Sequence, residues 1–212
     1  MTVRRYKKWI SFAVAVTMFG GAVSVHASGN PDAGEAQAAA CGACHGQDGA
    51  SPIDPSYPHL AGQNERYLLN QLKMIQNDTR NIALMAGQLN GKTEQDLADL
   101  AAFYASLPAK SSQAIGDDSA IRTGQRIYRA GIARKGVAAC IACHSPDGSG
   151  NQQAGFPRIS GQPSAYIIAQ LTAYRERVRA TDESLGGMMR GVAEGLTDTE
   201  IALVADYIQG LN

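Results

Sequence analysis

The chain has 212 residues, which is enough for one large or two small domains. Its composition is that of an ordinary globular protein, 44% apolar and 18% charged, with 19 basic and 19 acidic side chains. Four of the basic residues lie within the first eight positions, which leaves 15 basic against 19 acidic residues, or a net charge of about −4. This balance argues against nucleic acid and against anionic membrane surfaces as partners.

The first 27 residues have the features of an export signal. A basic start is followed by an apolar run over residues 10–25, and Val25-His26-Ala27 is similar to a small-x-small cleavage site. The run is short for a membrane span, which needs about 20 residues. We therefore expect residues 1–27 to be a signal peptide that is removed, so that the mature chain begins near Ser28.

The next predicted element is an Ala-rich helix over residues 32–40, which runs into Cys41-Gly42-Ala43-Cys44-His45. The C-x-x-C-H pattern is typical of covalent attachment of a c-type haem. Two intervening residues place both thiols along one edge of the porphyrin, where each adds to a vinyl group. The His that follows offers an imidazole nitrogen to the iron. The pattern returns at Cys140-Ile141-Ala142-Cys143-His144.

Three other interpretations of the cysteines fit less well. A zinc site would take two C-x-x-C pairs about 15–20 residues apart, whereas about 95 residues separate these pairs. A thioredoxin-like redox pair would lie near a βαβ pattern, and no strand pattern is near. Two disulfides would match the cysteine count but would leave both histidines unexplained.

The two halves of the chain are repeats. With Cys41 aligned on Cys140, an offset of 99, the segment 58–63 falls on 157–162. Further along the offset becomes 104, so the second repeat has five extra residues before its methionine. We expect two small domains, at residues 28–110 and 119–212, joined by a polar linker over 111–118.

All of the predicted elements are helices. Apolar residues recur at helical spacing over 64–76 and 163–174. The last helix of each repeat is expected to begin at a capping box, Thr93 with Asp96 and Thr197 with Glu200. One glycine near the start of the first helix of each repeat, Gly34 or Gly124, would let the last helix approach closely through Phe103 or Tyr207.

A methionine in each repeat is the candidate for the sixth iron ligand, because a thioether suits an electron-transfer haem. Met85 and Met189 both precede their capping Thr by eight residues, and we expect them in loops. Met188 is the second choice for the second haem, and Met74 fits core packing better.

Several residues are expected around the ligands. Pro58 and Pro157 each follow their His by 13 residues, and their carbonyls could accept the second imidazole N–H; the alternative is a plain turn proline. His59 has no histidine counterpart in the second repeat, and we expect it on the surface. Four arginines could neutralise haem propionates, although solvated side chains are the simpler reading for most of them: Arg80, Arg175, Arg177 and Arg179.

These motifs resemble a known family. Each repeat resembles a class I cytochrome c, and the doubled G-Q-x-x-x-Y-x-x-x-Q-L segment resembles the dihaem cytochrome c4 family. The resemblance implies an all-α fold of two tandem haem domains and a periplasmic electron carrier. It also implies two covalently attached haem c groups, with iron in each. Their thioether cysteines would be Cys41, Cys44, Cys140 and Cys143, and their axial ligands His45, Met85, His144 and Met189.

The resemblance also implies transient redox partners. A quinol-oxidising complex or another donor would supply electrons, and a haem–copper terminal oxidase would accept them; a loose association with the membrane stays open. One alternative is a dihaem peroxidase, which needs an iron open to peroxide and is disfavoured by a Met in each repeat. Another is the haem subunit of a dehydrogenase complex, which would have a large apolar surface.

Overall fold

The computed structural model describes residues 29–211, so the predicted signal peptide over 1–27 lies outside the described residues. Within the described part every regular element is a helix, and the only β pairing is two isolated bridges, Ile132 with Val137 and Asn151 with Phe156. The predicted all-α fold is confirmed. None of the described helices has the length and apolar character that a membrane crossing requires.

The helices form two successive sets, and the second set has more elements than the first. The N-terminal half contains α1 (Pro31–Glu35), α2 (Ala39–His45), α3 (Glu65–Gln76), the 3₁₀ turn η1 (Ala83–Met85) and α4 (Glu94–Ser106). The C-terminal half contains α5 (Asp118–Ala130), η2 (Ala133–Lys135), α6 (Ile141–His144), α7 (Ser164–Arg175), η3 (Glu183–Leu185), α8 (Met188–Glu194) and α9 (Asp198–Gln209).

The first predicted helix, over 32–40, is divided in the structure. The amide of Gln37 bonds to the carbonyl of Gly34 at 3.0 Å, and that of Ala38 to Glu35 at 3.1 Å. These i to i−3 bonds tighten the backbone into a turn between α1 and α2. The break re-aims α2, which carries the first C-x-x-C-H motif.

The last helix of each half packs against the first helix through a glycine. A Cβ placed on Gly34 would lie 2.1 Å from the carbonyl oxygen of Asp99, and one on Gly124 would lie 2.2 Å from that of Leu203. The Cβ atoms of Phe103 and Tyr207 are the next neighbours. The predicted close approach at both glycines is confirmed, and it fixes α1 on α4 and α5 on α9.

Both last helices begin at the expected capping boxes. The Thr93 hydroxyl accepts from the amide of Asp96 at 3.1 Å, and the Asp96 carboxylate accepts from the amide of Thr93 at 2.7 Å. Thr197 and Glu200 repeat the exchange at 3.3 and 2.9 Å. The buried faces of α4 and α9, which include Leu100 and Val204, form the centre of each core.

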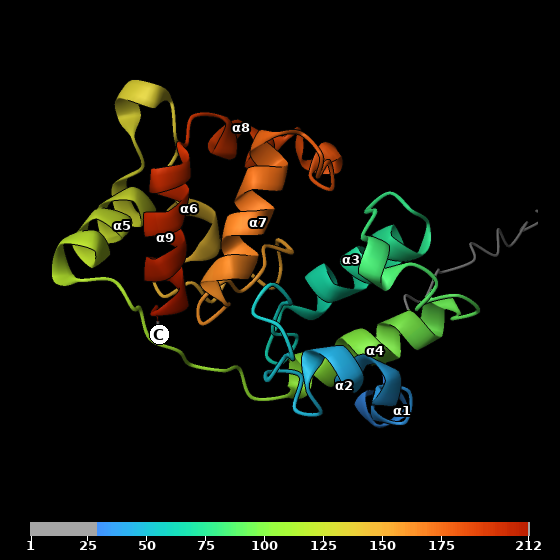
Figure 1. The fold of residues 1–212 in the computed structure, drawn as a ribbon. Coiled ribbons are helices and arrows are strands. Elements are labelled where there is room, and N and C mark those ends of the chain that lie inside the picture. Colours follow the sequence, from blue (N-terminus) through green and yellow to red (C-terminus); the bar gives the residue numbers. More distant parts are fainter. Residues whose placement is uncertain (1–28, 212) are drawn as a thin grey trace, which may run out of the picture.

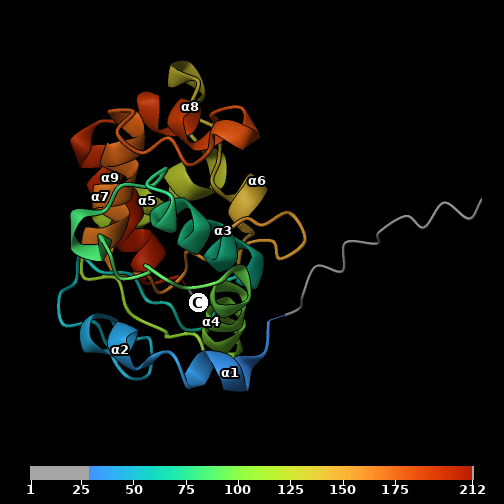
Figure 2. The same ribbon diagram turned by 90° about the vertical axis from the view of Figure 1, so that its right-hand side faces the viewer.

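The two halves lie against each other, with α3 and α7 facing across the seam (Figure 1). A turned view places α6 to α9 above α1, α2 and α4 (Figure 2). The segment between α4 and α5 has no regular structure and is held at both ends. Lys110 Nζ donates to the carbonyl of Ala50 at 2.8 Å, and the Asp206 carboxylate accepts from the amides of Ile115 and Gly116 at 2.8 and 3.1 Å.

Candidate haem sites

Each C-x-x-C-H motif lies on a short helix. Cys41 and Cys44 are on α2, whereas Cys140 caps α6 and Cys143 lies within it. All four thiols are free, and Cys44 is the most exposed of them. The helical turn between the two cysteines of a pair directs both sulfurs toward the same side. Burial raises the pKa of the Cys140 thiol to about 11.

The two motif histidines end their helices with buried rings, 8% exposed in His45 and 7% in His144. Nδ1 of His45 lies 3.1 Å from the carbonyl oxygen of Pro58, and Nδ1 of His144 lies 3.0 Å from that of Pro157. A carbonyl can only accept, so Nδ1 carries the proton and donates it. The lone pair is then on Nε2, which is the atom available to a metal.

Both imidazoles are held neutral. Burial lowers the pKa of His45 and of His144, and the hydrogen bond to the proline carbonyl opposes this only in part. A neutral imidazole is the form that can coordinate iron. The proline loop therefore fixes the tautomer, while burial fixes the charge.

The chain turns sharply after each His. Gly46 has φ +81°, and Ser145, in the same place of the second motif, has φ +69°, an uncommon value for a residue with a side chain. Hydrogen bonds hold Ser145 there: its hydroxyl donates to the carbonyl of Gly150 at 2.7 Å, and its carbonyl accepts from the Tyr128 hydroxyl at 2.5 Å. The turn brings the proline loop back over the imidazole.

The structure corrects the surroundings expected for the methionines. Neither is in an irregular loop: Met85 ends the 3₁₀ turn η1, and Met189 is the second residue of helix α8. The five extra residues of the second repeat provide the room for η3 and for the start of α8. Met188 is 40% exposed to solvent, whereas Met189 is half-buried.

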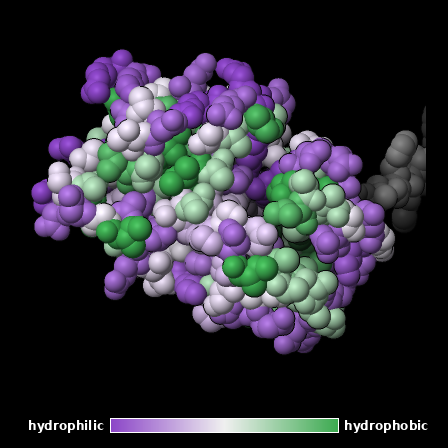
Figure 3. Space-filling view, in the orientation of Figure 1, coloured by the Kyte–Doolittle hydropathy of each residue, from purple (hydrophilic) through white to green (hydrophobic). Residues whose placement is uncertain are grey.

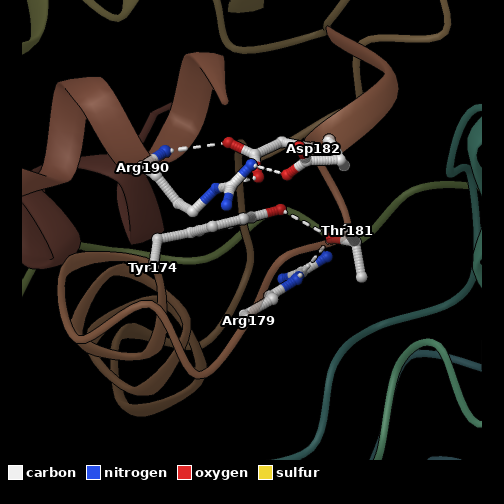
Figure 4. Close-up of polar contacts among 6 residues, drawn as sticks. Tyr174, Arg179, Thr181, Asp182 and Arg190 are labelled. Carbon is white, nitrogen blue, oxygen red and sulfur yellow. Dashed lines mark hydrogen bonds and ion pairs between the residues drawn. The ribbon is translucent and has the colours of Figure 1, made fainter. Parts of the chain in front are cut away.

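An ion pair fixes the start of α8 beside Met189 (Figure 4). The Asp182 carboxylate is almost fully buried and accepts from the backbone amide of Arg190 at 2.9 Å and from its Nε at 2.8 Å. The Asp182 carbonyl accepts from the amides of Leu185 and Gly187 at 2.9 and 3.0 Å. This one acid therefore organises the inserted residues and anchors the first turn of α8, which contains Met189.

The expectation that His59 lies on the surface was wrong. His59 is 8% exposed and lies in the seam between the halves, where burial lowers its pKa. Its amide donates to Oε1 of Gln162 at 3.0 Å, and its carbonyl accepts from Nε2 of the same side chain at 2.8 Å. The counterpart of His59 is Arg158, whose amide and carbonyl bond to Gln63 at 2.7 and 2.8 Å.

Sequence reasoning also misplaced two of the four arginines. Arg80 and Arg179 are 9% and 8% exposed and lie in the same seam, so they are not solvated. Arg177 is exposed and pairs with Glu194, as expected of a surface side chain, while Arg175 is partly buried and pairs with Asp198. The sequence did contain a signal that these two arginines are special. Arg80 and Arg179 are 99 residues apart, the same offset as Cys41 and Cys140, so they occupy equivalent positions of the two repeats.

The residues present fit a haem c in each half. Two free thiols, a buried imidazole with Nε2 available and a methionine are the set that such a group needs. Arg158 Nε and Ser160 Oγ, on the loop after Pro157, are buried without a hydrogen-bond partner among the described residues. Unpaired donors on the loop whose Pro157 carbonyl bonds to His144 suit an acidic group such as a haem carboxylate.

Comparison with known proteins decides the family. The sequence model of the cytochrome c family matches residues 32–108 and 121–212. Cytochrome c4 of Pseudomonas aeruginosa is 44% identical over 88% of this chain and 91% of that protein. The crystal structure of reduced recombinant cytochrome c4 from Pseudomonas stutzeri superposes with a TM-score of 0.83, at 40% identity, over 87% of this chain and all of that one. The chain belongs to the cytochrome c4 family. A thiosulfate dehydrogenase electron acceptor of Thiomonas intermedia is also similar, 35% identical over 81% of this chain and 78% of that protein.

Membership in the cytochrome c4 family identifies the cofactors and the class of activity. The protein is a dihaem c-type cytochrome with two covalently bound haem c groups, and it is an electron carrier rather than an enzyme. Haem iron supplies one-electron exchange between the ferrous and ferric states. The chain contributes orientation and exclusion of water, because each proline carbonyl holds an imidazole and both imidazoles are buried.

Proposed function

We propose that the protein is a periplasmic carrier that moves electrons between respiratory-chain partners, one electron per haem. The observation that carries the proposal is the doubled site, with the same His-to-proline-carbonyl contact in both halves. A quinol-oxidising complex or another donor would reduce it, and a haem–copper terminal oxidase would oxidise it. The export signal predicted over residues 1–27 supports the periplasmic location.

The proposed ligands follow the repeat. Cys41 and Cys44 bind the first haem and Cys140 and Cys143 the second, with His45 and Met85, and His144 and Met189, on the two irons. Pro58 and Pro157 orient the two histidines. We assign these sites to domains at residues 28–110 and 119–212 with a linker over 111–118. The half-buried position of Met189, beside the more exposed Met188, supports Met189 as the ligand.

A ligand test uses three single variants of the two-haem protein. Met85→Ala and Met189→Ala should each remove about half of the sulfur-to-iron charge-transfer absorbance of the ferric protein. After reduction, each variant should bind CO at one ferrous haem, since the thioether no longer blocks small ligands. Met188→Ala, the matched control, should keep both properties. If Met188→Ala lost half of the band and Met189→Ala kept it, the second assignment would be reversed.

A test of the carrier role measures turnover with partners. The reduced protein should be oxidised rapidly by membranes that contain a haem–copper oxidase, and cyanide, which blocks the oxidase, should stop the reaction. No oxidation above the rate of uncatalysed reaction with oxygen would contradict the proposed acceptor.

A second candidate is the electron acceptor of a dehydrogenase, supported by the similarity to the thiosulfate dehydrogenase electron acceptor. A permanent subunit would present a broad apolar face. On the face drawn in Figure 3, apolar residues occur in separate small groups among polar ones, which favours transient partners. Reduction by a thiosulfate-oxidising enzyme faster than by a quinol-oxidising complex would favour this second candidate.

A further inference from the structure

The two segments that contain the proposed methionine ligands are anchored differently. Met85 lies in residues 81–88, a segment whose one regular element is η1, and no residue of η1 is buried. Leu84, directly before Met85, is 70% exposed. A segment with so little buried apolar surface opens locally at a small cost in free energy.

The hydrogen bonds of this first segment are local. The amide of Met85 donates to the carbonyl of Ile82 at 2.8 Å, and its carbonyl accepts from the amide of Gln88 at 3.1 Å. Among the described residues, the hydrogen bonds of residues 81–88 stay within residues 81–90. The nearest side-chain anchor comes just after the segment, where Gln76 of α3 donates to the carbonyl of Leu89 at 3.0 Å.

A cavity of about 240 Å³ lies beside Met85, which forms part of its wall. Polar side chains line much of the remainder, including Gln76 and Asn90. No residue of the first C-x-x-C-H motif lines the cavity, so it is not the space that faces the imidazole of His45. Met85 can therefore turn into free space without displacing packed atoms, which is rarely possible in a protein interior.

The segment that contains Met189 is held by a buried ion pair. Arg190 directly follows Met189, and the Asp182 carboxylate accepts from its backbone amide at 2.9 Å and from its Nε at 2.8 Å. The Asp182 side chain is 3% exposed. Separating such a pair is costly, because each charge is then left buried without its partner. The pair therefore opposes movement of the backbone at Met189.

Further contacts tie this second segment to the body of its half. Thr181, directly before the acid, has its hydroxyl 3.1 Å from the hydroxyl of Tyr174 on α7 (Figure 4). On the other side of Met189, Ala193 of α8 is fully buried. Helix α8 is thus anchored at its start and packed along its length, whereas η1 is neither.

The sequence contains the same difference. At the offset of 104 that aligns Met85 with Met189, Arg190 falls on Ala86, which has no guanidinium. The four residues between Arg80 and Met85 include no acid. The first repeat therefore lacks both partners of the ion pair.

We propose that the first haem exchanges Met85 for a small neutral nitrogen ligand, while the Asp182–Arg190 pair keeps Met189 on the second iron. In the exchange, the sulfur of Met85 leaves the ferric iron with its lone pair, and a nitrogen lone pair takes its place. No electron or proton is transferred. Asp182 is a positioning residue, because it acts on Met189 through Arg190. The exchange rests on the axial ligands proposed above.

Ligand exchange at one haem changes how electrons are shared between the halves. A thioether ligand raises the reduction potential of a haem, so its replacement by nitrogen lowers the potential of the first haem alone. The second haem keeps its sulfur ligand and its potential. A redox titration in the presence of imidazole should therefore move one of the two one-electron waves and leave the other in place.

The test uses imidazole as the ligand and the sulfur-to-iron charge-transfer absorbance of the ferric two-haem protein as the signal. Saturating imidazole should remove the absorbance in two phases of equal amplitude, whose rates differ by about ten-fold or more. Met189→Ala should keep only the fast phase, and Met85→Ala only the slow one. Equal rates in the wild type, or the fast phase in Met85→Ala, would overturn the proposal.

The same variants separate this exchange from the ligand assignment on which it rests. If Met85→Ala and Met189→Ala do not each remove half of the absorbance before imidazole is added, the assigned ligands are wrong, and the exchange proposed here falls with them. If each removes half but the two rates are equal, the ligands stand and only the difference between the haems is refuted.

The role of Asp182 is tested by Asp182→Asn, which keeps the shape of the side chain but removes its charge. The slow phase should accelerate by about ten-fold or more, and the fast phase should not change. Glu183→Gln is the matched control, because Glu183 also pairs with Arg190 but is 80% exposed, and it should change neither rate. An unchanged slow phase, or equal acceleration of both phases, would refute a specific action on Met189.

A second variant keeps the test decisive if Asp182→Asn does not take up two haems. Arg190→Lys retains the positive charge and the backbone amide but loses the Nε donor that Asp182 accepts from. It should accelerate the slow phase alone, by less than Asp182→Asn would. A slow phase at the wild-type rate in Arg190→Lys would likewise refute the role of the pair.

Discussion

Two glycines determine how closely the first and last helices of each half pack. At Gly34 and Gly124, helices of the same half approach so closely that the carbonyl oxygens of Asp99 and Leu203 occupy the space of a side chain. Glycine is needed at these positions for the missing Cβ and not for an unusual backbone angle, since neither has a positive φ. The close approach places the first and last helices of each half in direct backbone contact.

A Cβ at either glycine should therefore destabilise the protein. Gly34→Ala and Gly124→Ala are each expected to lower the free energy of unfolding by about 1–3 kcal/mol, the usual cost of forcing packed elements apart. Gly191→Ala is the control, because it lies within α8 with no atom near its Cβ position, and it should be neutral or stabilising by up to ~1 kcal/mol. Denaturant unfolding of the haem-loaded variants measures all three. An unchanged midpoint in Gly124→Ala would mean that α9 can move away freely.

Residue-scale prediction from the sequence succeeded where the cause is local. The expectation that a proline carbonyl lies near the ring of each motif histidine rested on a fixed spacing of 13 residues, and the structure has this contact in both halves. His59 was misplaced because the residue that covers it, Gln162, is 103 positions away and in the other repeat. Nothing within a repeat indicates which of its loops faces the other repeat.

At the scale of elements, the Glu200 side chain both caps the start of α9 and connects η2 to it. The Glu200 carboxylate caps the amide of Thr197 and also accepts from Lys135 Nζ at 2.6 Å, which ties η2 to the last helix. The bond from Lys135, followed by that from the Thr197 amide, lowers the pKa of Glu200 to about 2. The capping box was predictable from four consecutive residues, whereas Lys135, 65 positions away, was not.

Glu200 should therefore make stability depend on pH in the acid range. The folded-state pKa of about 2 is below the ordinary value of 4.5, so the unfolded chain binds the proton first as pH falls. The stability that Glu200 provides is present above about pH 4.5 and is lost as pH falls toward 2. Glu200→Gln should cost ~1 kcal/mol at pH 7 and progressively less below pH 4.5.

Thermal unfolding of the wild type and Glu200→Gln at pH 7 and pH 3 measures the difference. Glu35→Gln, at an exposed acid outside the ion pairs of the described residues, is the control and should change neither value. A stability difference that stayed constant between the two pH values would show that the ionised carboxylate contributes nothing beyond its shape.

Helix α8 shows the limit of prediction at this scale. Repeat alignment placed Met189 opposite Met85, but it could not show that five inserted residues build η3 and begin a helix. That outcome depends on Asp182, whose buried carboxylate holds the amide and Nε of Arg190. The first repeat has no corresponding ion pair among its described residues. The alignment of the repeats therefore could not predict η3 or the start of α8.

For the whole molecule, the seam between the halves is polar and almost symmetric. Gln63 and Gln162 occupy equivalent places, and each exchanges two hydrogen bonds with a backbone amide and carbonyl of the other half. The Gly-Gln pair that precedes α3 and α7 was visible as part of the repeat, but a repeat shows only that two sites are alike. It does not show that they contact each other, and this relation became clear only in the structure.

Removal of both glutamines should let the halves separate. Each side chain makes two bonds, and a bond of this kind contributes about 0.5–1.5 kcal/mol, so Gln63→Ala with Gln162→Ala removes a substantial part of the docking energy. It also leaves the amides and carbonyls of His59 and Arg158 without those partners in a buried seam. Calorimetry should then resolve two transitions in place of a joint one, and small-angle scattering should show a larger radius of gyration. Gln125→Ala, at an exposed position of α5, controls for the loss of a glutamine and should leave both measurements unchanged. If the double variant still unfolded in one transition with an unchanged radius, the hydrogen bonds that Arg80 and Arg179 make across the seam would have to hold the halves together without the glutamines.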